Sequence, residues 1–236
     1  MRHGRRAFND RGRENELREL LHRRILTLDG AMGTMLQRRG LAAADFGGPD
    51  LEGCNENLVL TRPDVIRSVH EAYFAAGADL VETNTFGSIR HVLAEYGLQD
   101  KAREINRKAC ALAHQAAARH ATKVRPRFVA GALGPGTKTI SVTGGITYDE
   151  VLANYAEAAE GLLEGGADLL LLETQQDTLN VKASLNGVWE AFQMAGRSIP
   201  VRLSVSIENM GTMLGGQDIA ALAAAVEHFD LLALGM

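Results

Sequence analysis

"GADLVET" (77–83) and "GADLLLLET" (166–174) are near-copies of one another. In each stretch a glycine ends a helical pattern, a short apolar run follows at once, and the run ends in Glu-Thr. A helix that leads directly into a strand, more than once along a chain, is typical of a repeated βα array. The two stretches therefore predict an α/β fold with a parallel sheet.

The same alternation extends through most of the 236 residues. Six short apolar runs show little alternation with polar residues, as do parallel strands that are covered on both faces. The expected strands are residues 25–30, 78–85, 127–133, 167–174, 200–207 and 230–236. The expected helices are a short one from Glu14 and those at residues 62–77, 100–120, 147–166, 178–196 and 218–229. With 46% hydrophobic residues, the chain has enough apolar side chains for one domain with a sizeable core.

Charge and composition exclude several classes of protein. The formal net charge is −4 and the basic residues form no stripe, so we expect no nucleic-acid partner. No apolar run approaches the ~20 residues that span a bilayer, and the N-terminus lacks the apolar core of a secretory signal. We therefore expect a cytoplasmic protein with no membrane partner, whose two cysteines, Cys54 and Cys110, are reduced thiols.

Polar residues follow several expected strands, at the ends where βα folds carry their active sites. At the first such end, Asp29 is followed by Gly30 and Ala31. Small residues there leave backbone amides free to bind an anion beside a carboxylate, which suits the two charges of an amino acid. The alternative is that Asp29 caps a helix and that the glycines only fit a tight turn.

Two later strand ends supply further candidates. Glu173 follows four leucines, so a buried strand fixes its backbone. With Asp29 it is expected to hold a substrate ammonium, although two facing carboxylates suit acid-base chemistry equally well. Thr83 and Asn84 either orient a substrate or end their strand by bonding to the backbone. The loop "GALGPGTKTISVTGG" (131–145) is either a substrate cover or a mobile surface loop.

Five blocks of the sequence resemble the homocysteine S-methyltransferase family, and within it the N-terminal homocysteine-binding module of cobalamin-dependent methionine synthases. The blocks are "LDGAMGTMLQRRGL" (28–41), "GCNENLVLTRPDVIRSVHEAYFAAGADLVETNTFGS" (53–88), "GPGTKTISVTGGITYDEV" (134–151), "GGADLLLLETQQDTLNVKA" (165–183) and "GTMLGGQDIAAL" (211–222). The resemblance covers residues 17–236, and five separate blocks make it specific.

The resemblance implies a TIM barrel, (β/α)8, of which about six βα units lie in this chain. Residues 1–13 are polar, arginine-rich and without periodicity, so we expect them to form a disordered extension. The incomplete homocysteine-binding barrel domain is then expected at 14–236. In the site that the resemblance implies, backbone amides bind the carboxylate of homocysteine, acidic side chains bind its ammonium, and polar residues line the pocket. The amides are those of Gly30 and Ala31, and the acids are Asp29 and Glu173. The pocket-lining residues are Thr34, Thr83 and Asn84.

The resemblance also implies cofactors and partner modules. In such enzymes zinc binds the homocysteine thiol and lowers its pKa, and the thiolate attacks methylcobalamin on another module. The family's zinc cysteines follow the sixth and eighth strands, so they are expected beyond Met236. Cys54 and Cys110 do not match them, and the histidines lack the paired spacing of a metal site. We therefore expect a truncated chain that binds neither zinc nor cobalamin tightly and is inactive without the cobalamin- and folate-binding modules of its parent.

Three alternatives stay open. Betaine- or S-methylmethionine-dependent homocysteine methyltransferases share the superfamily, although "GAMGTM" and "NTFG" favour the cobalamin-dependent enzymes. A lyase or aldolase barrel would need a Schiff-base lysine on a strand, and every lysine here falls in an expected helix or loop. A non-catalytic fragment that binds an amino acid would also lack the zinc cysteines.

Overall fold

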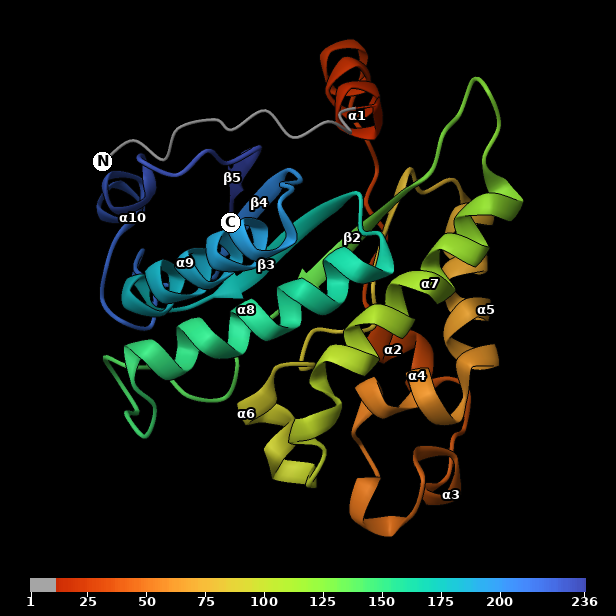
Figure 1. Ribbon diagram of the computed structural model, residues 1–236, viewed down its shortest axis with the longest axis horizontal. Helices are drawn as coiled ribbons and strands as arrows, with labels where there is room; N and C mark the ends of the chain where they lie inside the picture. The colour runs from red at the N-terminus through yellow and green to blue at the C-terminus, as the bar shows by residue number, and fades with distance from the viewer. Residues whose placement is uncertain (1–11) are drawn as a thin grey trace.

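Residues 12–236 are described by the structure, a computed structural model with one parallel sheet and helices packed against it (Figure 1). The strands are β1 (Leu80–Glu82), β2 (Phe128–Leu133), β3 (Leu169–Gln175), β4 (Val201–Val205) and β5 (Ala233–Gly235). The helices are α1 (Gly12–Arg23), α2 (Met32–Gln37), α3 (Ala43–Phe46), α4 (Leu58–Thr61), α5 (Pro63–Ala76), α6 (Arg90–Leu93), α7 (Ala102–His120), α8 (Tyr148–Gly165), α9 (Thr178–Ala195) and α10 (Ile219–Val226). None of these helices has the length and apolar character that crossing a membrane requires.

The five strands lie in the order β1-β2-β3-β4-β5, and each neighbouring pair is parallel. Helices α8, α9 and α10 connect β2 to β3, β3 to β4 and β4 to β5, so consecutive strands are neighbours. This is the strand order of a (β/α) barrel, whereas the order reverses within a doubly wound sheet. The predicted α/β fold with a parallel sheet is confirmed.

The prediction of a regular strand at residues 25–30 is wrong. Leu28 makes an isolated parallel bridge to Leu80, flanked by backbone hydrogen bonds from Asp79 to Thr27 and from Asp29 to Leu80. The amide of Glu82, which a longer strand would bond through a carbonyl, donates instead to Oδ1 of Asp29 (2.9 Å). A side chain has taken the place of the backbone, so the ladder ends at this point.

Both faces of the sheet are covered. One face packs against α7, α8 and α9 and forms the larger core, with Val129 and Leu170 among its members. Alternate strand residues face the other way, where Phe128 and Leu171 pack around Leu17 of α1. Helix α1 therefore covers this second face at the end where β2 begins (Figure 1). We call the face that carries Phe128 and Leu171 the inner face of the sheet.

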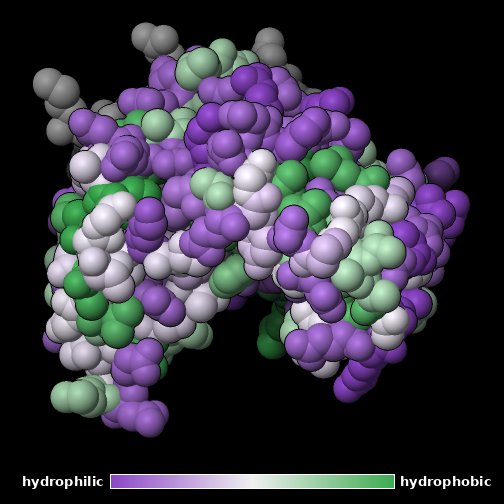
Figure 2. All heavy atoms as spheres, turned by 90° about the horizontal axis from the view of Figure 1, so that it is seen from below, coloured by the Kyte–Doolittle hydropathy of each residue, from purple (hydrophilic) through white to green (hydrophobic). Residues whose placement is uncertain are grey.

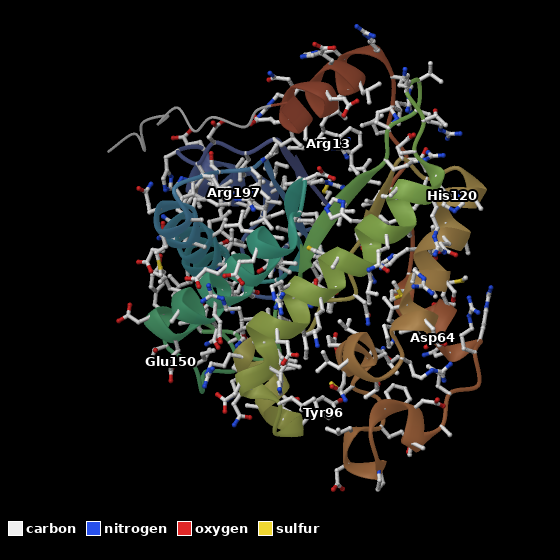
Figure 3. All side chains as sticks on the ribbon, turned by 45° about the vertical axis from the view of Figure 1, so that its right-hand side comes forward. Arg13, Asp64, Tyr96, His120, Glu150 and Arg197 are labelled. Carbon is white, nitrogen blue, oxygen red and sulfur yellow. The ribbon has the colours of Figure 1, made fainter. Side chains whose placement is uncertain are left out.

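Arg13 ties α1 to the amino ends of the strands (Figure 3). Its Nε lies 2.9 Å from Oδ1 of Asp168, just before β3, and its Cζ lies 4.3 Å from the centroid of the Phe128 ring. Gly12 and Arg13, which the sequence assigned to a polar extension, thus belong to a packed helix. Residues 1–11 of that extension lie outside the described residues.

The opposite end of the sheet is open. Seen from below, the molecule is hollowed between the side that carries α8 and α9 and the side that carries α3 and α4 (Figure 2). The loop that follows β2 lies on this side, so the hollow opens at the carboxyl ends of the strands (Figure 1).

One buried group in the core makes stability depend on pH. His70 of α5 is 0% exposed, and neither ring nitrogen has a hydrogen-bond partner among the described residues. Burial lowers its pKa from 6.5 to about 4, so on acidification the unfolded chain binds a proton before the folded protein does. The lowered pKa therefore costs stability as the pH falls below about 6.5.

Replacing His70 by leucine is expected to remove this acid sensitivity. Between pH 7 and pH 5 the wild type should lose about 1–2 kcal/mol of unfolding free energy relative to the variant. Urea unfolding at the two pH values measures the difference. His22→Leu, at an exposed position of α1, is the matched control. Parallel pH dependence of wild type and His70→Leu would show that His70 is not the group responsible.

Candidate functional site

Three carboxylates meet at the carboxyl ends of the strands. Asp29 lies at the end of the Leu28 bridge, Glu82 ends β1, and Glu173 lies near the end of β3. Each side chain is part-buried, and Asp29 accepts a hydrogen bond from the backbone amide of Glu82. The structure therefore brings together the two acids that the sequence selected, Asp29 and Glu173, and adds Glu82 to them.

The pKa values of these carboxylates show that the site favours a cation. The pKa of Asp29 is raised to about 8, mainly by burial, and the negative charges of Glu82 and Glu173 contribute to this rise. Burial raises the pKa of Glu173 to about 8, to which the charge of Glu82 also contributes. The pKa of Glu82 rises to about 6 through burial, and the charge of Arg202 opposes the rise for both glutamates. A bound cation would relieve the repulsion among the three acids.

A β-bulge presents Glu173 at this site. The register between β3 and β4 passes from Leu172 opposite Leu203 to Gln175 opposite Val205, so two residues of β3 oppose one of β4. Thr174, the second residue of the bulge, has φ of 57° and is the one non-glycine residue with positive φ among residues 12–236. A β-branched residue rarely adopts this conformation, and such strain concentrates at functional sites. The four leucines that precede Glu173 in the sequence do not predict the bulge.

The alternative in which Asp29 caps the following helix is wrong. Helix α2 has Ala31 as its N-cap residue, and the carboxylate of Asp29 bonds to Glu82 instead of capping the helix. Oη of Tyr73 would lie 3.4 Å from a Cβ placed on Gly30, and it lies 3.5 Å from the carbonyl oxygen of Ala31. Tyr73 belongs to α5 and was not selected from the sequence, where it fits the apolar face of a helix.

Thr83 and Asn84 are buried and bonded to the backbone. Oγ1 of Thr83 accepts from the amide of Ala132 on β2 (3.0 Å), and Nδ2 of Asn84 donates to the carbonyl of Asn55 (2.7 Å). These contacts hold the strand end and the preceding loop together. Thr34 is exposed on α2. The structure thus places Asp29, Gly30, Ala31 and Glu173 at one end of the sheet and gives Thr83 and Asn84 partners within the fold.

The loop at 134–145 is anchored to the start of α9. Asp177, fully buried, accepts from the amide of Ser141 (3.0 Å) and caps α9 by accepting from the amide of Leu179 (2.9 Å). Asn180 bonds to the backbone of the same loop, accepting from Ile140 (2.8 Å) and donating to Lys138 (2.9 Å). These bonds argue against a freely mobile surface loop.

The described residues do not fit a zinc site. Cys54 and Cys110 are buried in different apolar clusters, and no group of three or more His, Cys, Asp or Glu residues within 12–236 is placed to hold a metal ion. Burial raises the pKa of Cys54 to about 11 and raises the pKa of Cys110 as well, which opposes the thiolate that zinc requires. Both cysteines behave as small core residues.

Residues 26–236 match the family model described as homocysteine S-methyltransferase. The methionine synthase of Mycobacterium leprae (strain TN) is 45% identical over 230 residues, which are 98% of this chain and 19% of that protein. The methionine synthase of Mycobacterium tuberculosis (strain ATCC 25618 / H37Rv) is 44% identical over 223 residues, which are 94% of this chain and 18% of that protein. The chain thus spans about a fifth of the length of these curated relatives.

Solved structures of the homocysteine methyltransferase MmuM from Escherichia coli have a similar fold. The oxidized form has a TM-score of 0.76 at 26% identity, with 93% of this chain and 75% of that chain covered. The metallated form has the same TM-score at 25% identity, with 93% and 76% covered. The similarity spans nearly the whole of this chain but about three quarters of the MmuM chain, which is longer.

Proposed function

This chain belongs to the homocysteine S-methyltransferase family, and we propose that it binds the amino-acid end of homocysteine at the carboxyl ends of its strands. The observation that carries the proposal is the group of three part-buried carboxylates at Asp29, Glu82 and Glu173. Part-buried acids whose charges raise one another's pKa gain from a cation, and an ammonium group supplies one.

The residues take complementary parts in this proposal. Asp29 and Glu173 hold the ammonium of homocysteine, while the backbone amides of Gly30 and Ala31 hold its carboxylate. Glu82 fixes the orientation of Asp29, because its amide donates to that carboxylate. The pocket around homocysteine is lined by Thr34, Thr83 and Asn84. Because the side chains of Thr83 and Asn84 are bonded to the backbone, these two support the pocket wall and do not bind the substrate.

We propose that the complete enzyme is a methionine synthase of the cobalamin-dependent kind that the sequence resembles, since relatives named methionine synthase share 44–45% identity with this chain. A thiol must lose its proton to act as a nucleophile, and the zinc that the resemblance implies would supply that activation in the complete enzyme. Within residues 12–236 no group of three or more His, Cys, Asp or Glu residues is placed to hold the metal, and the chain spans about a fifth of its relatives. In this proposal the zinc cysteines and the cobalamin- and folate-binding modules belong to the rest of the complete enzyme. The 236 residues alone would bind homocysteine without methylating it.

The alternatives are less well supported. An enzyme that uses betaine or S-methylmethionine would share the fold, but the homocysteine methyltransferase MmuM shares only 26% identity with this chain, compared with 44–45% for the methionine synthases. A Schiff-base lyase would need a lysine on a strand, and the five described strands contain none.

Isothermal titration calorimetry with a series of ligands tests the proposal. L-Homocysteine and L-methionine should both bind at one site, because both carry the ammonium and the carboxylate. 4-Mercaptobutanoic acid, which lacks the ammonium, should bind at least tenfold more weakly, since the buried acids then have no cation. Equal affinity for all three ligands, or no binding of either amino acid, would contradict the proposal.

A further inference from the structure

Arg202 places a cation within the parallel sheet. It is the one lysine or arginine within the five described strands. On β4, Val201, Leu203 and Val205 are buried in the larger core, so Arg202 and Ser204 alternate onto the inner face. Glu82 and Glu173 face the same side, since each is two residues beyond a leucine of the inner cluster, Leu80 and Leu171.

The register shows how far the guanidinium reaches. Arg202 lies opposite Leu171 of β3 and Ala233 of β5, whereas Ser204 lies opposite Gly235. A Cβ placed on Gly235 would lie 3.6 Å from Nη2 of Arg202, so the side chain extends along the sheet to the level of Gly235. Gly235 lies two residues closer to the carboxyl ends of the strands than Ala233, the residue opposite Arg202. The guanidinium therefore reaches towards the level of Glu173, two residues beyond Leu171.

The guanidinium makes no hydrogen bond or ion pair with any residue that the structure describes, in contrast to Arg13 and Arg24 at the other end of the sheet. The charges near it belong to Glu82 of β1 and Glu173 of β3, and it favours the ionised form of both. Asp29, before α2, and Tyr73, on α5, are further titratable groups beside these glutamates, and the charge of Arg38 acts on Tyr73. Arg202 is thus placed to act on the carboxylates by its charge alone.

We propose that Arg202 is a positioning residue whose charge lets Glu82 and Glu173 ionise at lower pH than they otherwise would, so that the site begins to hold the substrate's ammonium at lower pH. It acts through the two glutamates and does not contact the substrate. The inference rests on the proposed function, because it concerns the same site. It adds a residue that the family resemblance did not point to, and it ties the affinity to pH.

The test is the pH profile of L-homocysteine binding in Arg202→Met, which keeps an unbranched apolar side chain and removes the charged guanidinium. In the wild type the affinity should rise with pH as the acids ionise. In the variant this rise should begin at higher pH. A rise that begins one pH unit higher corresponds to about tenfold weaker binding at pH 7, with equal binding at high pH. Arg202→Lys should restore the profile, and Arg23→Met, exposed on α1, is the control.

Two results would overturn the inference: an unchanged profile, or an equal loss of affinity at every pH, which is the mark of a direct contact. A second measurement needs no ligand. A carbon-13 NMR titration of the glutamate carboxyl groups should show Glu173 losing its proton at higher pH in Arg202→Met than in the wild type. If homocysteine does not bind at all, the proposed function fails, while the titration still decides the role of Arg202.

Discussion

Glu173→Gln is expected to weaken the binding of L-homocysteine by at least thirtyfold, which corresponds to about 2–5 kcal/mol. Glutamine has the shape of glutamate and fits the bulge of β3, but it lacks the charge that faces the ammonium. Asp29 and Glu82 would remain, so a weakened site is expected rather than a collapsed one. Calorimetry at about pH 8.5, where the wild-type carboxylates are ionised, measures the loss.

The matched control is Glu208→Gln, an exposed carboxylate in the loop after β4. It should bind homocysteine as the wild type does. Thermal unfolding of both variants shows whether the fold is intact. If Glu173→Gln binds within twofold of the wild type, Glu173 is not the ammonium ligand, whatever its place in the structure.

Asp79→Ala is expected to cost about 3–5 kcal/mol of unfolding free energy, a large part of the stability of an ordinary domain. The side chain of Asp79 is 2% exposed and accepts from Arg24 (2.6 Å) and from the amide of Thr27 (3.0 Å). Arg125 and Arg127 lie 3.6 and 3.5 Å from it. Removing the carboxylate leaves three arginines facing one another at the amino ends of the strands. Urea unfolding at pH 7 measures the effect, and Asp50→Ala, at an exposed position, is the control.

The pH dependence provides a second check on Asp79. The hydrogen bonds from Arg24 lower the pKa of Asp79 from 3.8 to about 2. Because this pKa is lowered on folding, the stabilisation is complete above the unfolded value and is lost as the pH falls from about 4 towards 2. Asp79→Ala should lack this acid-dependent loss. A variant within 1 kcal/mol of the wild type at pH 7 would show that Arg24 and its neighbours find other partners.

The longer helices were predictable because their ends carry local signals, whereas the short helices α2, α3, α4 and α6 were not predicted. Gly77 follows α5 with φ of 112°, which suits glycine, and Thr147 and Glu150 form a capping box at the start of α8. These signals lie within a few residues of the boundary they set. The predicted helices at 62–77 and 147–166 therefore differ from α5 and α8 by one residue at each end.

The details of the site depend on contacts between distant residues, which local patterns do not record. The bulge at Glu173 depends on the register of β3 against β4, and the end of the first expected strand depends on Asp29 bonding to Glu82. Arg202 was part of an apolar strand pattern, and its inward direction follows from alternation that only the packing of β4 reveals. Asp29 and Glu173 were predictable because both stand directly at strand ends.

A crystal structure of the chain with L-homocysteine at about pH 8.5 would show whether the carboxylates at the strand ends form the ammonium site. We expect the ammonium nitrogen within about 3 Å of carboxylate oxygens of both Asp29 and Glu173, and the carboxylate on the amides of Gly30 and Ala31. Homocysteine bound away from these carboxylates, or bound with its carboxylate towards Glu173, would contradict the proposed function.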